Sequence, residues 1–350
     1  MEYRYNGFIP QNIAPKGAKS LAICNASGNK IYTIPLGKMT HPTGTKLYSF
    51  GLISDLHIVE NGLAVTWNPS TKVDNVLTYF ESMGCVFCAS TGDNTNRGFY
   101  ESDGTTFNAN QFEEYKRVCD LHSIPVYGAC GNHDSYFKAI TESITELETY
   151  TGKGLYFLIE QGNDVHIFLG QSASTTPMSD EALQWFYETL EMNRNKRCFV
   201  YVHPYLDGGN ANDLYGNDVF SWWGTKTTVF KNLLKHYKNT ILFHGHSHNS
   251  FDCQEVDKTA NYNESTGFRT THVPSVSRPT EIVDGVRTTD DTKSFGYVVD
   301  VYSDYIVLNG MDFINDDFAP LGVLKIDTTL VEIEANTFTD STGTIATLAA

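Results

Sequence analysis

Short apolar runs, each followed directly by a polar segment, recur along the middle of this 350-residue chain. Runs of this kind are typical of strands buried on both faces, as in a parallel sheet. They span residues 47–53, 85–89, 124–127, 197–202 and 240–243. Apolar side chains at helical spacing mark the segments between them, at residues 69–83, 109–122 and 179–192, with Ser179 as a suitable N-cap for the last. Alternating strands and helices predict an α/β fold.

The two ends of the chain have a different pattern. Residues 21–24 and 30–35 flank a turn that contains glycine, which predicts a hairpin. Weaker strand signals lie in a Thr-rich segment near the other end, at residues 323–326 and 330–334. Residues 297–301 and 305–308 predict a further hairpin inside the main body.

We therefore expect a β-rich N-terminal arm over residues 1–46, a main domain over residues 47–312 and a β-rich C-terminal tail over residues 313–350. The simplest role of the arm and the tail is to add strands to the main domain. The alternative is that they pair with another protein or another copy, because short β elements rich in Gly, Thr and Asn loosely resemble the appendages of phage tail or surface-associated proteins.

Each of the five predicted strands is followed by residues of metal-binding type. In α/β sheets the ligand crevice lies beyond the carboxyl ends of the strands, so residues distant in sequence converge there. The candidate ligands, in chain order, are Asp55, His57, Asp93, Asn132, His203, His246 and His248. Carboxylate, amide and imidazole donors together suit divalent metal ions, and the set is large enough for two ions that share one carboxylate.

The ordered motifs resemble the calcineurin-like metallophosphoesterase superfamily, whose pattern runs DxH, GDxx, GNH[DE], a lone His and GHxH. The resemblance extends over residues 47–312 and implies a four-layer αββα sandwich with a dinuclear site at the strand ends. It also implies two ligand sets that share Asp93. One consists of Asp55, His57, Asp93 and His248, and the other of Asp93, Asn132, His203 and His246.

Two divalent ions roughly 3.5–4 Å apart clamp the attacking and leaving oxygens of a phosphoryl transfer and lower the pKa of a bound water towards about 7. We therefore expect hydrolysis of a phosphoester by a metal-bound hydroxide. By the resemblance, His133 is the proton donor to the leaving group, and Asp134 orients it and raises its pKa. The oxygen-rich ligand set favours manganese, with iron, zinc, nickel and cobalt as alternatives.

Two further groups of residues are candidates for binding substrate. Residues 92–98 are close to the GDxxDRG segment of protein Ser/Thr phosphatases, so Asn96 and Arg97 are candidate phosphate-binding residues. The alternative for Arg97 is a solvated charge. Asn96 stands where that branch has Asp, so we do not expect a protein phosphatase. Trp222 and Trp223 are expected to pack in the core, or else to form an apolar wall for a substrate ring.

Charge and hydropathy limit the remaining possibilities. A formal net charge of −16 disfavours nucleic acid as a partner, because no basic stripe is present to neutralise phosphates, although some relatives process DNA ends. The first thirty residues lack the pattern of a secretory signal, and no apolar run reaches the roughly 18 residues of a membrane span. We expect a cytoplasmic protein, or a virion or surface-associated one if the terminal segments bind an assembly.

The expected substrate is a phosphodiester, either a small molecule or a component of the cell envelope. This follows from the combination of DxH, GNHD and GHxH, which resembles the bacterial branch that cleaves cyclic nucleotides and glycerophosphodiesters. A phosphomonoesterase or a pyrophosphatase is the nearest alternative. A structural subunit of a phage tail or surface assembly, with the phosphoesterase-like domain as a scaffold, is the alternative from another class.

Overall fold

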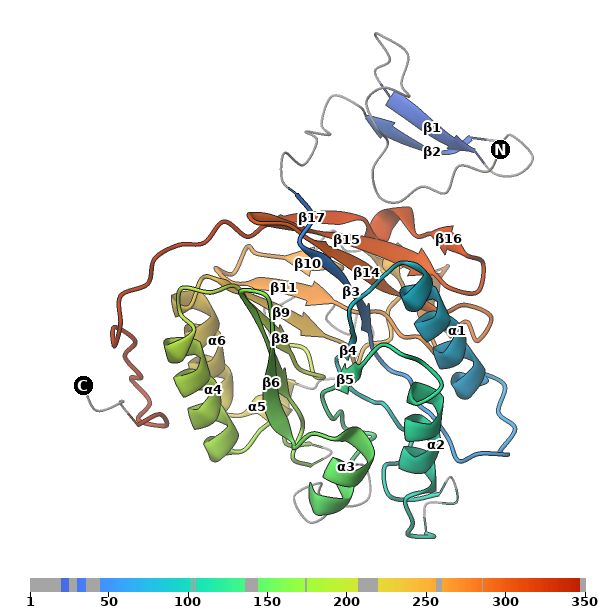
Figure 1. The fold of residues 1–350 in the computed structure, drawn as a ribbon, viewed down its shortest axis with the longest axis horizontal. Helices are drawn as coiled ribbons and strands as arrows, with labels where there is room; N and C mark the ends of the chain where they lie inside the picture. The colour runs from blue at the N-terminus through green and yellow to red at the C-terminus, as the bar shows by residue number, and fades with distance from the viewer. Residues whose placement is uncertain are drawn as a thin grey trace.

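The computed structural model describes residues 20–24, 30–35, 45–101, 103, 105–135, 144–173, 175–206, 220–255, 260–284 and 286–346. Two large sheets face each other within this part of the chain (Figure 1). The first has the strand order β16-β15-β14-β3-β4-β5, and β17 also pairs with β15. Its strands are β3 (Tyr48–Ile53), β4 (Cys88–Ser90), β5 (Val126–Gly128), β14 (Phe295–Val301), β15 (Tyr305–Asp312), β16 (Asp317–Phe318) and β17 (Leu324–Asp327).

The second sheet has the order β10-β11-β9-β8-β7-β6, with β7, β8, β9 and β11 parallel. Its strands are β6 (Tyr156–Gln161), β7 (Asp164–Leu169), β8 (Cys198–Tyr201), β9 (Thr240–His244), β10 (Tyr262–Asn263) and β11 (Arg269–His272). Two small hairpins are separate from both sheets: β1 (Ser20–Cys24) with β2 (Lys30–Pro35), and β12 (Thr280–Val283) with β13 (Val286–Thr289).

Helices cover the outer face of each sheet, with α1 and α2 on one side and α4 and α6 on the other (Figure 1). The helices are α1 (Pro69–Ser82), α2 (Asn110–Cys119), α3 (Ile144–Thr151), α4 (Asp180–Met192), α5 (Phe220–Trp223) and α6 (Lys226–His236), with 3-10 turns η3 (Phe251–Glu255) and η4 (Pro320–Gly322). The three helices predicted from apolar spacing correspond to α1, α2 and α4 and are confirmed. The side chain of Ser179 caps α4 by accepting from the backbone N–H of Ala182, at 3.1 Å.

Three hydrophobic clusters hold the layers together. Between the sheets, the rings of Phe50 on β3 and Phe199 on β8 are fully buried and lie 5.7 Å apart. Phe80 of α1 packs in a cluster with strands of the first sheet. Phe186 of α4 and Phe230 of α6 stack at 5.1 Å in a cluster with strands of the second. The layers therefore run helix, sheet, sheet and helix, which confirms the expected α/β sandwich.

The terminal segments behave differently from each other. The predicted N-terminal hairpin is present as β1 and β2, which among the described strands pair only with each other. At the other end, β17 adds to the first sheet through β15, so part of the predicted tail extends the sandwich. The division of the chain at residues 46 and 312 remains a prediction, as does pairing of the terminal segments with another protein.

The strand predicted at residues 330–334 is wrong, since this segment has no regular secondary structure. Its backbone bonds to side chains instead of a neighbouring strand. The N–H and C=O of Val331 contact the side-chain amide of Asn239 at 2.9 and 2.8 Å, and the N–H of Ile333 donates to Asn195 Oδ1 at 2.9 Å. Ile333 packs with the cluster under α4 and α6. The tail therefore crosses from the first sheet to the helices that cover the second (Figure 1).

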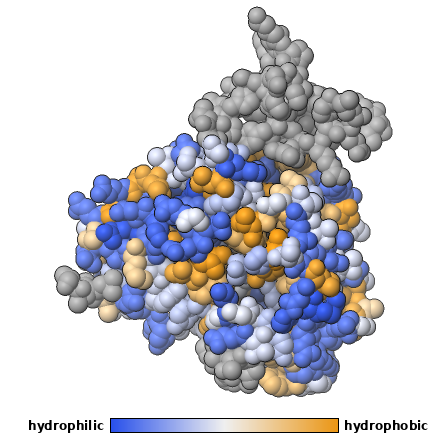
Figure 2. Space-filling view, viewed as in Figure 1, coloured by the Kyte–Doolittle hydropathy of each residue, from blue (hydrophilic) through white to orange (hydrophobic). Residues whose placement is uncertain are grey.

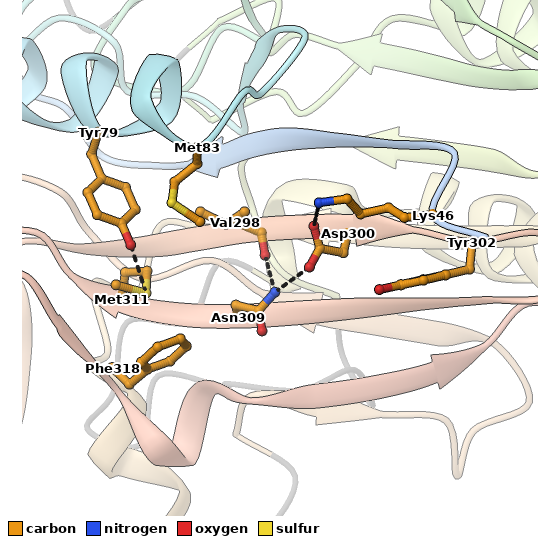
Figure 3. A pocket seen from close by; sticks show the side chains of 9 residues that line it. All are labelled: Lys46, Tyr79, Met83, Val298, Asp300, Tyr302, Asn309, Met311 and Phe318. Carbon is orange, nitrogen blue, oxygen red and sulfur yellow. Dashed lines mark hydrogen bonds and ion pairs between the residues drawn. The ribbon is translucent and has the colours of Figure 1, made fainter. Parts of the chain in front are cut away.

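A cavity of about 220 Å³ lies on the helix side of the first sheet, between α1 and the strands β14 and β15 (Figure 3). Tyr79 and Met311 form part of its apolar wall. Its polar side is formed by Asp300, which accepts from Lys46 at 3.2 Å and from Asn309 at 3.2 Å. The cavity lies alongside the strands rather than at the ends that carry the candidate ligands.

Figure 2 shows one face of the molecule as mainly hydrophilic, with hydrophobic residues scattered across it in small groups. None of the helices in the described ranges combines the length and the apolar character needed to cross a bilayer.

Candidate metal centre

The candidate ligands come from loops at the carboxyl ends of both sheets. In the first sheet, Asp55 and His57 follow β3, Asp93 follows β4, and Asn132 lies beyond β5. In the second, His203 follows β8, and His246 and His248 follow β9. Parallel strands point their carboxyl ends to the same edge, and the two sheets face each other, so these loops meet.

The first cluster consists of Asp55, His57, Asp93 and His248, whose donor atoms lie within 4.8 Å of one another. His248 Nε2 is 3.1 Å from Asp55 Oδ1 and 3.0 Å from His57 Nε2. His57 Nε2 is also 3.8 Å from Asp93 Oδ2. One ion placed among these atoms would have two carboxylate oxygens and two imidazole nitrogens as ligands.

The second cluster consists of Asp93, His203 and His246. His203 Nε2 is 3.1 Å from Asp93 Oδ2 and 3.3 Å from His246 Nδ1. The carboxamide oxygen of Asn132 lies 2.9 Å from the same His246 nitrogen, which adds a fourth donor. The structure therefore brings all seven predicted ligands together, and Oδ2 of Asp93 faces both clusters.

Hydrogen bonds fix the direction of both carboxylates. Asp55 Oδ2 accepts from the hydroxyl of Ser54 at 2.6 Å and from the backbone N–H of His246 at 3.2 Å. Asp93 Oδ1 accepts from the backbone N–H of His133 at 2.8 Å. The remaining oxygens face the clusters, and the buried Asp55 Oδ1 has the imidazole Nε2 of His248 beside it, at 3.1 Å. A buried anionic oxygen is costly unless a cation binds there, so these residues fit a metal pair.

Burial and mutual charge set the protonation of the cluster. Burial works against ionisation of Asp55 and Asp93, but the charges of His248 on the first and His203 on the second hold both pKa values well below their usual range. Burial alone would lower the pKa of His203, yet Asp93 and Asp55 outweigh it and raise this pKa to about 9. Burial lowers the pKa of His246 to about 3. Metal ligands must be deprotonated. Asp55, Asp93 and His246 are therefore ready to bind a metal, whereas His203 would release a proton when a metal binds.

Two glycines of the motifs allow the loops to approach closely. A Cβ on Gly131 would collide with Asp93 Oδ1, and a Cβ on Gly245 would collide with the hydroxyl of Ser54. The glycines of GNHD and GHSH are therefore required by packing against the neighbouring ligand loop.

Five of the seven ligands have left-handed backbone. The φ angles are 54° at Asp55, 46° at His57, 52° at Asp93, 73° at His246 and 59° at His248. Backbone hydrogen bonds between ligand loops support this geometry, since the N–H of Asp55 donates to Gly92 O at 3.0 Å and that of His57 to Asp93 O at 2.9 Å. Strained backbone of this kind concentrates at functional sites.

His133 lies beside the first cluster, with its ring 4.6 Å from that of His57 and perpendicular to it. Its Nδ1 bonds to the backbone carbonyl of Asn96 at 2.7 Å. Asp134, which we expected to orient it, instead accepts from the backbone of Asn94, Thr95 and Gly131. Burial, followed by the charge of Asp93, raises the pKa of Asp134 to about 6. Asp134 thus joins the GDNT and GNHD loops, and the Asn96 carbonyl contacts Nδ1 of His133. An influence of Asp134 on His133 remains a prediction.

The other candidate substrate residues are only partly placed by the structure. Arg97 is half-buried, and its backbone N–H donates to Gln111 Oε1 at 2.7 Å. Its contact with a phosphate remains a prediction, as does that of the Asn96 side chain. Trp222 and Trp223 separate into two roles. Trp223 is buried in the core, whereas Trp222 is half-buried, with its ring 5.2 Å from that of His246.

The sequence did not predict the residues that orient the metal ligands through hydrogen bonds. Ser54 directly precedes the ligand Asp55, and Thr91, whose hydroxyl donates to Ser54 Oγ at 2.7 Å, lies two positions before the ligand Asp93. His248 is oriented by the carbonyl of Arg278, which bonds to its Nδ1 at 3.1 Å. Adjacency to a ligand could have indicated Ser54, but a backbone carbonyl thirty residues away leaves no sequence signal.

Two donor clusters that share one carboxylate, at the ends of two facing sheets, define a candidate dinuclear metalloprotein. Comparison of the sequence with protein families finds calcineurin-like phosphoesterase over residues 48–250. This match covers more than half of the chain, and the protein belongs to that family. The superfamily expected from the ordered motifs is thereby confirmed. No curated protein matches the sequence.

Solved structures share the fold at low identity. A dimetal phosphatase from Danio rerio has a TM-score of 0.56 and 14% identity, with 81% of this chain and 100% of that chain covered. A purple acid phosphatase from yellow lupin (Lupinus luteus) seeds has a TM-score of 0.51 and 11% identity, with 82% and 55% covered. GAP50, the anchor in the inner membrane complex of Plasmodium, has a TM-score of 0.51 and 10% identity, with 86% and 93% covered. At these identities the likeness shows the fold alone.

Proposed function

We propose that this protein hydrolyses a phosphodiester with the help of two divalent metal ions held by the clusters around Asp93. Family membership supports a metal-dependent phosphoric ester hydrolase. The observation that carries the proposal is the convergence of two donor clusters on one buried carboxylate, with Asp55 Oδ1 also buried and facing the imidazole of His248. A vestigial scaffold would have no need to keep these costly groups together.

When bound, a pair of divalent ions supplies a nucleophile from water at neutral pH and neutralises charge on the phosphoryl oxygens. The chain's own residues supply the proton transfer. A carbonyl only accepts hydrogen bonds, so the contact with Asn96 O requires a hydrogen on Nδ1 of His133. The imidazole therefore exchanges its second proton at Nε2, and protonated His133 donates from that atom to the leaving oxygen. Asp134 acts as a positioning residue because it holds the loop that carries His133.

The preference for a diester rests on the motifs. The combination of DxH, GNHD and GHxH resembles the branch that cleaves cyclic nucleotides and glycerophosphodiesters. Asn96 and Arg97 follow Asp93 in the same loop and are the proposed contacts for the phosphate. The preferred metal is proposed to be manganese, because Asp55, Asp93 and Asn132 provide oxygen donors beside the imidazoles.

The test compares hydrolysis of bis(p-nitrophenyl) phosphate and p-nitrophenyl phosphate by chelator-stripped protein to which manganese is returned. Faster cleavage of the diester, lost in a folded Asp93→Asn variant, is the expected result. Cleavage of the monoester alone would overturn the diester proposal in favour of a phosphatase. No cleavage of either compound with any of the five candidate metals would overturn the hydrolase and favour the structural subunit. Recovery with zinc but not manganese would refute the proposed metal.

A further inference from the structure

Trp222 occupies a position that core packing does not explain. Its indole ring lies 5.2 Å from the imidazole of His246, at an interplanar angle of 68°. Trp223, the next residue, is 2% exposed and belongs to the core cluster under α4 and α6, but Trp222 keeps part of its surface exposed. Adjacent residues in the short helix α5 thus face different environments.

The ligands of the metal centre differ in exposure. Asp55, Asp93 and His203 are each no more than 1% exposed. His246 and His248, by contrast, keep exposed surface, as does His133. These three imidazoles are therefore parts of the site that a substrate can contact, and the indole of Trp222 lies beside one of them, His246.

The neighbours of Trp222 hold α5 firmly against the body. The indole N–H of Trp223 donates to the backbone carbonyl of Tyr205 at 3.1 Å, and its ring lies 4.9 Å from that of Phe230. Tyr205 is itself buried, with its ring 5.9 Å from that of His246. The indole of Trp222 is therefore anchored beside the second cluster, and a rigid aromatic ring binds with little loss of conformational entropy.

We infer that Trp222 determines substrate specificity by packing against a planar ring of the substrate, attached to the phosphate that the clusters bind. The inference rests on the proposed function and extends it to a substrate class: phosphoesters of an alcohol that carries an unsaturated ring, as a nucleoside or an aryl group does. Aromatic rings prefer centroid separations of about 4.5–7 Å, so a substrate ring that packs on Trp222 would lie close to His246, whose own ring is 5.2 Å from the indole.

Two phosphonates that differ only in the ring separate this inference from the function itself. Phenylphosphonate and methylphosphonate have the same anionic group and are not hydrolysed, so their affinities for manganese-loaded protein can be measured by calorimetry. We expect phenylphosphonate to bind more tightly than methylphosphonate. In Trp222→Ala, its affinity should fall about three- to tenfold, with methylphosphonate unaffected. Trp222→Phe should restore most of the difference.

Trp185→Ala is the matched control, because Trp185 is also half-buried but packs on Tyr156 under the second sheet, with rings 5.1 Å apart. It should leave both affinities unchanged. Equal affinities of the two phosphonates, or equal losses of both in Trp222→Ala, would overturn the role of Trp222 and leave the proposed function intact. Absence of binding by either phosphonate, together with absence of hydrolysis, would overturn the proposed function and the inference with it.

Discussion

Replacement of Ser54 by Ala should weaken metal binding as well as the fold. The Ser54 hydroxyl donates to Asp55 Oδ2 at 2.6 Å and accepts from Thr91 Oγ1 at 2.7 Å. Without it, Oδ2 keeps the backbone N–H of His246, at 3.2 Å. The carboxylate then rotates more freely, and Oδ1 loses its fixed direction toward the first cluster.

Loss of a group that orients a metal ligand typically reduces metal affinity about 10- to 100-fold. This corresponds to roughly 1.4–2.8 kcal/mol of binding free energy. The free energy of unfolding of the metal-free protein should also fall, by about 1.5–3 kcal/mol, because a hydrogen bond to a charged group is removed from a buried position.

Ser49 provides a matched control on β3, the strand that leads to Ser54. Its hydroxyl is also buried and also donates to a carboxylate at 2.6 Å, that of Asp300 beside the cavity in Figure 3. Ser49→Ala should lose similar stability and keep full metal affinity. Urea unfolding of the metal-free proteins gives the first quantity, and competition with a chromogenic chelator gives the second. Equal metal affinities of Ser54→Ala and Ser49→Ala would refute the argument that Ser54 acts through Asp55.

Three further predictions follow from other contacts. His133→Asn should lower kcat by about 10²–10⁴ for a diester with an alkyl leaving group, and by less for one with p-nitrophenolate, a leaving group that needs no proton. The metal content, measured by mass spectrometry, should not change. An equal loss of kcat for both leaving groups would refute the role of His133 as proton donor. Gly131→Ala should reduce bound metal, because its Cβ would displace the Asp93 carboxylate; full occupancy would contradict this. Asn239→Ala should lower the free energy of unfolding by about 1–3 kcal/mol, since its buried amide satisfies both backbone groups of Val331, and an unchanged urea midpoint would show that the tail contributes nothing.

The ligand set could be predicted because each ligand lies within a few residues of the end of a strand whose apolar pattern is visible in the sequence. The position of a residue in such a loop and its chemical type together predict a ligand, since the carboxyl ends of parallel strands converge regardless of the sequence of the intervening helices. The apolar pattern also predicted the helices, since apolar residues at helical spacing in α1, among them Val73 and Phe80, are buried.

The errors have physical causes that a linear pattern does not contain. The strand β7 was missed because its apolar run is interrupted by Asp164 and His166, and both are buried in polar contacts. Asp164 pairs with Arg197 at 2.6 Å, and His166 contacts the hydroxyls of Tyr48 and Tyr201. Residues that are distant in sequence form the hydrogen bonds of these buried polar groups. A polar residue within a strand pattern can therefore be either exposed to solvent or buried in a hydrogen-bond network, and the sequence does not distinguish the two.

Residues that lie next to each other in sequence also misled the prediction. Asp134 follows His133 directly, which suggested a pair, but no sequence signal indicated the contacts of Asp134 with its own loop or of His133 with the carbonyl of Asn96. Trp222 and Trp223 were treated as one feature, but one lies beside the metal centre and the other in the core. Side chains one position apart on a helix point in different directions, so adjacency there argues against a shared role.

The left-handed backbone of five ligands has a free-energy cost that depends on the type of residue. A non-glycine residue in such a conformation costs on the order of 1–3 kcal/mol, so five of them together rival the roughly 5–15 kcal/mol by which a domain is stable. Asp and His are among the residues that tolerate positive φ best, so the types that bind metals also keep this cost low. Hydrogen bonds between the ligand loops, such as that from the N–H of His57 to Asp93 O, offset part of this free-energy cost. Because these bonds join one ligand to the next, displacement of a single loop should release several ligands together. The centre should therefore gain and lose its metals in a cooperative manner.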